Sequence, residues 1–357
     1  MQKLRALKVS VVCLAVVMAL VMLSGCQKIG KANSSSNSIT DFDQRTVTMP
    51  AQVNRVLGLH PVSTYAIWRL APDKLISVDW VFQWMYLQST STKYLSDADI
   101  AKLSKLPVTG TFFAKMNTEQ VISLKPDVII TLDSDINVDK LQQQAKIPVV
   151  AVGKEPLSGY EDTFRMVGKI VGNGQEADKL ADFWDKTLKT AQAETAKVPD
   201  SKKLKVFYTG KLGNVLTTVG KNTIMGSVID MAGGINLGDQ LSDTGNESAT
   251  VSMEQILAWN PDIIIVATEG GKQQIMNDPR WKNLTAVKEG KVYVPPQYGD
   301  LDSVQSILGL VWTQGLLLHN NDAASKAYLA QEMKAYYPLF FNRQITDQQI
   351  NQVCTQL

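Results

Sequence analysis

The sequence predicts an α/β protein with two Rossmann-like lobes, each built on a mostly parallel central sheet, joined by one long α-helix. Three observations predict this fold class. Short apolar segments alternate with helical patterns, which is typical of βαβ units around a parallel sheet. A helix–turn–strand unit occurs twice, and a long helical pattern lies between the two copies. The chain has 357 residues, which is long enough for two domains.

Residues 1–25 have the pattern of an export signal. Three basic residues precede an apolar run at positions 9–23, which is shorter than the roughly 20 residues of a membrane-spanning helix. The following Leu23-Ser24-Gly25-Cys26 resembles the lipobox of bacterial lipoproteins. We therefore expect a lipoprotein signal peptide over residues 1–25 and a lipid on Cys26, which would hold the protein on the extracytoplasmic face of the cell membrane. The alternative is an ordinary signal peptide with a chance cysteine.

Composition narrows the class of protein further. The formal net charge is +2, and the predicted signal carries three positive charges away, so the mature chain is close to neutral. This argues against nucleic-acid binding, which needs a basic surface. Of the three cysteines, Cys13 lies in the signal and Cys26 would be lipidated, so only Cys354 remains and no internal disulfide is expected. Residues 26–44 are polar and predict a flexible tether.

The repeated unit covers residues 117–130 and 252–265. In each copy an N-capping residue, Asn117 or Ser252, precedes a short helical pattern that a proline ends. A continuous β-branched run follows, as expected for a strand buried on both faces. The match has no gaps, and it predicts an N-terminal lobe over residues 45–160 and a C-terminal lobe over residues 201–357. A generic α/β chain that repeats such a pattern loosely is the alternative.

A helical pattern from about Gln175 to Lys197 lies between the two copies. Leu180, Trp184 and Leu188 recur at four-residue spacing and mark one apolar face. At 1.5 Å per residue the helix would be roughly 35 Å long, which is enough to connect two lobes. We assign residues 161–200 to an interlobe helix region; a surface helix within one domain is the alternative.

Three segments carry a resemblance to a known family: residues 119–130, 251–264 and 278–293. The sequence resembles the substrate-binding lipoproteins of importers for iron–siderophore, haem and cobalamin, the group with a rigid interlobe helix, over about residues 45–353. The resemblance implies two α/β lobes with the ligand in the cleft between them, no cofactor, and delivery of the ligand to an ABC permease dimer. In this family an acidic residue on each lobe docks to the permease, and the candidates here are Asp135, Asp139 and Glu269. Ordinary solvating acids are the alternative for these three residues.

Candidate ligand-binding residues follow the predicted strands, because α/β sheets bind ligands at the carboxyl ends of their strands. His60 is the single candidate for direct metal contact, or for a hydrogen bond to the ligand; a helix-start residue tied to the backbone is the alternative. Trp80 and Trp84 suit a large conjugated ligand, although their alternating spacing equally fits a strand packed on the core. The remaining candidates, each alternatively a solvated loop residue, are Phe112, Phe113, Lys115, Lys211, Asn214, Tyr298 and Asp300.

The predicted function is capture of an iron complex, siderophore or haem, for an ABC importer, without catalysis. Cobalamin or an oxyanion such as molybdate remains an alternative ligand. A lipid-anchored hydrolase or chelate-processing enzyme is the alternative class, with His60 as its only imidazole base near the cleft. The sequence carries no phosphate-binding loop, nucleophile elbow or Cys-x-x-Cys motif that would favour it.

Overall fold

The structure is a computed structural model that describes residues 37–89, 94–111, 116–132, 137–153, 157–241 and 248–355. The predicted signal peptide and Cys26 lie outside these residues. The chain enters the described part through an antiparallel hairpin of β1 (Ser38–Thr40) and β2 (Thr46–Thr48). Residues 38–44, which the sequence assigned to the tether, therefore form part of a paired structure. Asp41 fixes this hairpin to the first lobe, because its carboxylate accepts a hydrogen bond from the backbone N–H of Ala151.

The N-terminal sheet is parallel and runs in the order β3-β6-β7, formed by Val56–Gly58, Val128–Thr131 and Val149–Ala151. A parallel pair, β4 (Val78–Asp79) and β5 (Val108–Thr109), extends it through a bridge between Val56 and Leu75. The helices of this lobe are α2 (Pro61–Leu70), α3 (Trp80–Phe82), the π-helix η1 (Gln83–Leu87), α4 (Asp97–Leu103), α5 (Thr118–Ser123) and α6 (Val138–Ala145).

The C-terminal sheet repeats this order. Its parallel strands run β10-β8-β12-β13, formed by Ile235–Asn236, Lys205–Thr209, Ile263–Val266 and Val292–Tyr293. Here β8, β12 and β13 correspond to β3, β6 and β7. A two-stranded antiparallel sheet of β9 (Thr217–Val219) and β11 (Ser248–Thr250) lies beside it. The helical segments are η3 (Asp200–Lys202), η4 (Lys211–Gly213), α9 (Ile224–Met231), η5 (Leu237–Gln240), α10 (Met253–Trp259), α11 (Glu269–Asn277), α12 (Thr285–Lys288), α13 (Ser306–His319), α14 (Ala323–Phe341) and α15 (Asp347–Thr355).

The two copies of the repeated unit lie in separate sheets, which confirms the prediction of two related lobes. The predicted N-caps form: the side chain of Asn117 accepts a hydrogen bond from the N–H of Gln120, and Ser252 accepts one from Gln255, each at 3.1 Å. The helix of each copy ends before a left-handed residue, Lys125 with φ of 49° and Asn260 with φ of 43°.

The Pro-Asp turn of each copy binds the neighbouring strand. The Asp127 carboxylate accepts hydrogen bonds from the backbone N–H groups of Asn54 and Arg55, and Asp262 accepts one from Lys205, all within 2.9 Å. Arg55 and Lys205 return the contact, because their side chains donate to carbonyls at the end of the repeat helix, including those of Leu124 and Trp259. A cation is favourable at a helix C-terminus. Each lobe thus uses one acid and one base to join the repeat helix to the first strand of its sheet.

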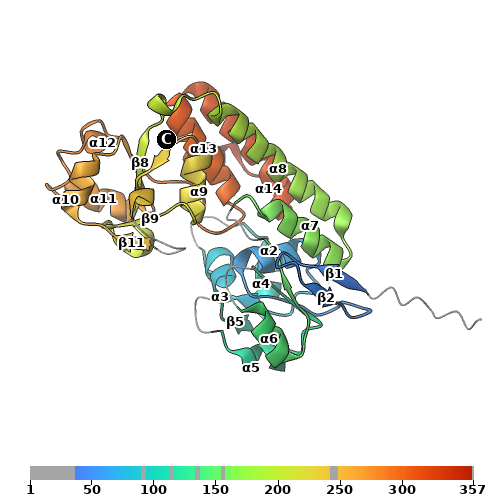
Figure 1. The fold of residues 1–357 in the computed structure, drawn as a ribbon. Helices are drawn as coiled ribbons and strands as arrows, with labels where there is room; N and C mark the ends of the chain where they lie inside the picture. Colours follow the sequence, from blue (N-terminus) through green and yellow to red (C-terminus); the bar gives the residue numbers. More distant parts are fainter. Residues whose placement is uncertain are drawn as a thin grey trace, which may run out of the picture.

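The predicted interlobe helix is α8 (Gly174–Thr195), which extends from one lobe to the other (Figure 1). Its ends differ from the predicted Gln175 and Lys197 by one and two residues. At its start α8 packs against α7 (Tyr160–Val171), which also contacts α2, and further along it contacts α13 and α14. Its buried face includes the predicted Leu180, Trp184 and Leu188.

A second helix, α14, also connects the lobes. Its C-terminal end reaches the N-terminal lobe, where the Tyr65 hydroxyl donates to the carbonyl of Phe340 at 2.6 Å and Arg69 donates to Leu339 at 2.9 Å. Buried rings from α2, α7, α8 and α14 surround this contact, with the stacked rings of Tyr336 and Phe340 4.4 Å apart. One hydrophobic cluster therefore continues through both lobes, and two smaller clusters complete the separate lobes.

Candidate functional site

Two loop regions at the carboxyl ends of the sheets contact each other across the lobes. We call this contact the interlobe junction. The C-terminal lobe contributes residues 297–305, which follow β13, and the N-terminal lobe contributes His60, Trp84, Tyr86, Ser89 and Tyr94. Within it, Tyr86 donates to the side-chain oxygen of Gln305 at 2.9 Å, and Tyr94 donates to the carbonyl of Gln297 at 3.1 Å. The amide of Gln297 in turn donates to Ser89 at 3.1 Å. The junction is therefore a specific polar and aromatic contact.

His60 lies in the junction and is 1% exposed. It is the N-cap of α2, and its Nδ1 accepts a hydrogen bond from the N–H of Val62 at 3.2 Å. Its Nε2 lies 3.2 Å from a carboxylate oxygen of Asp302 in the other lobe. Because Nδ1 accepts, Nε2 carries the hydrogen and donates to Asp302. His60 therefore caps the helix, as the alternative interpretation of the sequence expected, and it also contacts the opposite lobe. To coordinate a metal ion, its ring would have to lose the hydrogen bond to Val62 or the one to Asp302.

The aromatic segment after β4 is helical, which rules out the alternative of a strand packed on the core. Trp80 and Trp84 are 39% and 46% exposed, whereas Phe82 and Tyr86, which alternate with them, are buried. The indole N–H of Trp80 donates to Thr111 at 3.0 Å.

Tyr298 brings a ring from the C-terminal lobe to this aromatic surface. Its ring centroid lies 5.5 Å from that of Trp84 and 5.9 Å from that of Tyr94. Its φ of 63° is in the left-handed region, which costs a residue with a side chain roughly 1 kcal/mol or more. Strain of this kind is often found where a ligand is held. The structure thus brings the predicted residues Trp84 and Tyr298 together from opposite lobes.

Two buried carboxylates, one beside the junction and one within it, have raised pKa values. Asp79 caps α3 by accepting hydrogen bonds from the N–H groups of Val81 and Phe82, and burial raises its pKa despite the opposing effect of these hydrogen bonds. Asp300 accepts a hydrogen bond from the hydroxyl of Tyr208 at 2.8 Å. Burial raises the pKa of Asp300 to about 6, against the opposing effects of that hydrogen bond and the nearby charge of Lys211.

The other predicted residues have varied positions. Lys211 lies in η4 and is half-buried beside Asp300, whereas Asn214 is exposed and its side chain accepts a hydrogen bond from Leu216 in a turn. Asp139 forms an ion pair with Arg45 at 3.0 Å, and Glu269 is exposed in the first turn of α11. The predictions for Phe112, Phe113, Lys115 and Asp135 lie outside the described residues.

Sequence reasoning missed Tyr94, Tyr208, Gln297 and Gln305. Tyr208 lies next to the carboxyl end of β8, so its position on that strand was a usable signal. The other three depend on which segment of one lobe contacts the other, and no local pattern encodes that choice.

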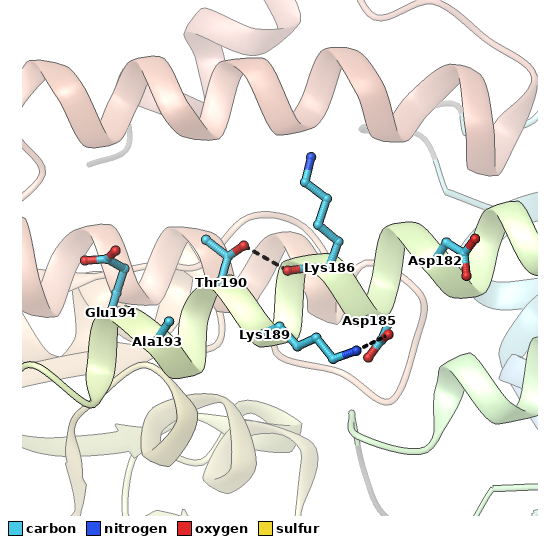
Figure 2. Close-up of a pocket in the computed structure, with 7 residues that line it drawn as sticks. All are labelled: Asp182, Asp185, Lys186, Lys189, Thr190, Ala193 and Glu194. Carbon is cyan, nitrogen blue, oxygen red and sulfur yellow. Dashed lines mark hydrogen bonds and ion pairs between the residues drawn. The ribbon is translucent and has the colours of Figure 1, made fainter.

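A hollow of about 530 Å³ lies along α8 rather than at the junction (Figure 2). Its lining comes entirely from α8, and Lys189 and Asp185 form an ion pair within it at 2.6 Å. Because it lies on one face of a single helix, it does not bring together groups from the two lobes. It is therefore a less suitable ligand site than the junction.

The described part of the chain contains neither a cluster of metal ligands nor a membrane-spanning helix. No three His, Cys, Asp or Glu side chains gather there in an arrangement that would hold a metal ion. Within those same residues, no helix combines the length and apolarity required to cross a bilayer.

Comparison with known proteins identifies the family. The model of the periplasmic binding protein family matches residues 84–298, more than half of the chain. The chain is 27% identical to the uncharacterised ABC transporter substrate-binding lipoprotein YvrC of Bacillus subtilis over 297 residues, covering 78% of this chain and 87% of that protein. It is 25% identical to the molybdate-binding protein MolA of Haemophilus influenzae over 284 residues, covering 73% and 77%.

A third relative is the iron(3+)-hydroxamate-binding protein YxeB of Bacillus subtilis, 24% identical over 303 residues, covering 80% of this chain and 88% of that protein. The fold matches that of an ABC transporter solute-binding protein from Sulfurospirillum deleyianum with a TM-score of 0.76 and 24% identity, covering 89% and 99% of the two chains. These relatives are binding proteins rather than enzymes. The chain therefore belongs to the periplasmic binding protein family, and its homologues are substrate-binding proteins of ABC transporters.

Proposed function

We propose that this protein binds an iron complex, a siderophore or haem, between its two lobes and delivers it to the permease of an ABC importer. The observation that carries the proposal is the approach of Trp84 and Tyr298 from opposite lobes, at the carboxyl ends of two duplicated parallel sheets. Ligands of open α/β sheets bind at this edge. Relatives named for iron(3+)-hydroxamate support an iron complex, and those named for cobalamin and molybdate keep these two as alternatives.

The remaining parts of the proposal concern location and docking. We propose that Cys26 carries a lipid, and that residues 26–37 connect it to the hairpin of β1 and β2. For contact with the permease, Glu269 is exposed on the C-terminal lobe, and Asp135 is the candidate on the N-terminal lobe. Asp139 is a weaker candidate because Arg45 already neutralises it.

An enzymatic role would need a nucleophile and a base in contact. The only imidazole at the junction, His60, hydrogen-bonds to the Val62 N–H through Nδ1 and to the Asp302 carboxylate through Nε2. Neither partner is a nucleophile of the hydroxyl or thiol type. We therefore propose capture and release of the ligand without chemical change.

The first experiment is purification of the chain without residues 1–26, followed by an absorption spectrum and ligand titration. A Soret band would identify haem, and a visible charge-transfer band a ferric siderophore. Titration of the emptied protein is followed by tryptophan fluorescence. We expect Trp84→Ala to weaken binding at least about fivefold, because a ligand gains about 1 kcal/mol or more from stacking on an aromatic face.

The matched control is Leu257→Ala, which truncates another exposed apolar side chain far from the junction on α10. It should leave the affinity unchanged. If ferric siderophores, haemin, cobalamin and molybdate all leave fluorescence and melting temperature unaltered, the proposed function is wrong.

A further inference from the structure

Gln305 is a buried residue of the interlobe junction, and only one end of its side-chain amide has a hydrogen-bond partner. It is 1% exposed and is the N-cap of α13. Its Oε1 accepts a hydrogen bond from the hydroxyl of Tyr86 at 2.9 Å. Its Nε2 is buried and has no hydrogen-bond partner among the described residues. Because this nitrogen carries two donor hydrogens, a strong donor is left unsatisfied between the lobes.

The orientation of the amide does not remove this exception. Exchanging the two ends of the Gln305 amide would let Nε2 donate to the Tyr86 hydroxyl, but Oε1 would then be the buried atom without a partner. Buried polar groups in folded proteins nearly always have a partner, so each exception calls for one. Another glutamine of the same helix shows the ordinary arrangement: Gln314 is 6% exposed, and its Nε2 donates to the carbonyl of Ala191 at 2.8 Å.

A second buried polar atom without a partner lies in the same loop. Asp302 directs one carboxylate oxygen to His60 of the opposite lobe, whereas its Oδ1 is buried and makes no hydrogen bond within the part of the chain that the structure describes. Asp302 and Gln305 both contact the N-terminal lobe, so these two atoms belong to the same interface. An unsatisfied acceptor and an unsatisfied donor at one interface are the groups that a molecule bound between the lobes would satisfy.

Tyr86 is held firmly enough to fix the direction of the Gln305 amide. Its ring is buried, and its centroid lies 4.7 Å from that of Phe82 and 5.9 Å from that of Tyr94. Close packing of this kind restricts the ring to one position. The hydroxyl therefore holds Oε1 of Gln305 and turns Nε2 away from Tyr86.

We propose that Gln305 contacts the ligand, donating a hydrogen bond from Nε2 to one of its oxygens, and that Tyr86 is the positioning residue that holds the amide in this direction. The proposal rests on the proposed function and adds to it a pair of residues that meet only across the two lobes. It does not depend on the charge of the ligand, because a carbonyl, carboxylate or oxo oxygen can each accept this hydrogen bond.

The test is a double-mutant cycle measured on ligand affinity. Ferrioxamine B, haemin, cyanocobalamin and sodium molybdate are titrated by calorimetry into the wild type, Gln305→Met, Tyr86→Phe and the double variant. For each probe that the wild type binds, Gln305→Met should weaken the affinity about fivefold, as for one lost hydrogen bond. Tyr86→Phe should weaken it about twofold, because the amide remains but is no longer oriented. In the double variant the loss should equal that of Gln305→Met alone, because Tyr86 acts only through Gln305.

The matched control is Gln314→Met, the same substitution at another buried position of α13. It removes the hydrogen bond to Ala191, so it should lower the melting temperature and leave the affinity unchanged. Circular dichroism shows whether each variant is folded, and Gln305→Ala, with the same expected loss of affinity, replaces Gln305→Met if that variant does not fold.

Each remaining outcome contradicts a stated part of the proposal. An unchanged affinity in folded Gln305→Met, or an equal loss in Gln314→Met, would overturn the contact between Gln305 and the ligand while leaving the proposed function intact. If Tyr86→Phe weakens binding as much in the Gln305→Met background as in the wild type, Tyr86 does not act by positioning Gln305. If none of the four probes binds the wild type, both this proposal and the proposed function are wrong.

Discussion

The His60 ring makes two separate hydrogen bonds, and substitutions can test the contribution of each one. One ring nitrogen caps α2 and the other bonds to Asp302 of the opposite lobe. The sequence suggested the cap because the histidine precedes Pro61 and a helical pattern. The loop of Asp302 was expected at the cleft, but the sequence could not predict its contact with His60, because the two residues are distant in the chain and meet only when both lobes have folded.

We expect His60→Ala to lower the free energy of unfolding by about 1 kcal/mol or more, because it removes an N-cap and the contact with Asp302. His60→Asn should retain most of the stability, since asparagine is itself a preferred N-cap. Urea denaturation of both variants measures the difference. Equal losses in the two variants would show that the cap contributes little.

Asp300 makes stability depend on pH. Burial raises its pKa to about 6 in the folded protein from an ordinary value of 3.8. The folded state therefore binds the proton more tightly, and the associated stability is present below pH 4 and lost as the pH rises through 6. Asp300→Asn should remove this loss and raise the free energy of unfolding at pH 8 by about 2 to 3 kcal/mol, with little effect at pH 4.

Thermal melts across this pH range measure the effect, with Asp178→Asn as the control. The Tyr208 hydroxyl can still donate to the asparagine oxygen, so the local hydrogen bond is retained. A constant difference between Asp300→Asn and the wild type at pH 4 and pH 8 would argue against the raised pKa.

Among the helices and strands, those of the repeated unit match the sequence-based predictions best. Its caps, its proline stop and its apolar strand are local features, and local physical chemistry determines them. The clamp formed by Asp127 with Arg55, and by Asp262 with Lys205, was not predicted. Its partners lie on a neighbouring strand, and the two basic residues do not share the constant offset of the repeat.

Asp127→Ala and Asp262→Ala should each lower the free energy of unfolding by about 1 to 2 kcal/mol, because each leaves backbone donors at a strand start without their acceptor. The two sites belong to different sheets and share no partner, so the double variant should show the sum within about 0.5 kcal/mol. Chemical denaturation tests this. A loss much smaller than the sum would mean that the two lobes unfold separately, so that only the weaker one is being measured.

The junction was the least predictable element. Trp84 and Tyr298 were both proposed as ligand residues from their loops, but their contact depends on how the lobes are placed. The helical turn η1 also went unrecognised, because Trp80, Phe82, Trp84 and Tyr86 alternate as a strand would. In the structure the segment is a short α-helix followed by a π-helix, which turns the exposed and buried rings to different sides.

At the scale of the whole molecule, the two lobes share a hydrophobic cluster in addition to the helix between them. Rings from α2, α7, α8 and α14 meet around Phe340, which is fully buried. The sequence predicted the single connection by α8 because its apolar face is periodic. It did not predict the second connection by α14, whose apolar and aromatic residues lie on several sides of the helix.

Phe340→Ala should cost about 3 to 5 kcal/mol, as for other large buried aromatic residues. Because the cluster contains residues of both lobes, we expect calorimetry to show one unfolding transition that moves to lower temperature as a unit. Leu257→Ala, at an exposed position of the C-terminal lobe, is the control and should have little effect. A split into two transitions, with only one of them shifted, would show that the lobes are independently stable.

The return of α14 to the first lobe also affects how the protein is made. Tyr65 and Arg69 find their partners at Phe340 and Leu339, which lie 275 and 270 residues later in the chain. The ribosome produces the residues of the first lobe well before it produces α14, yet α14 supplies part of that lobe's interior. For a chain that is exported, as we propose, the first lobe would complete its packing only after α14 has crossed the membrane, and this delay favours passage through the translocation channel in an unfolded form.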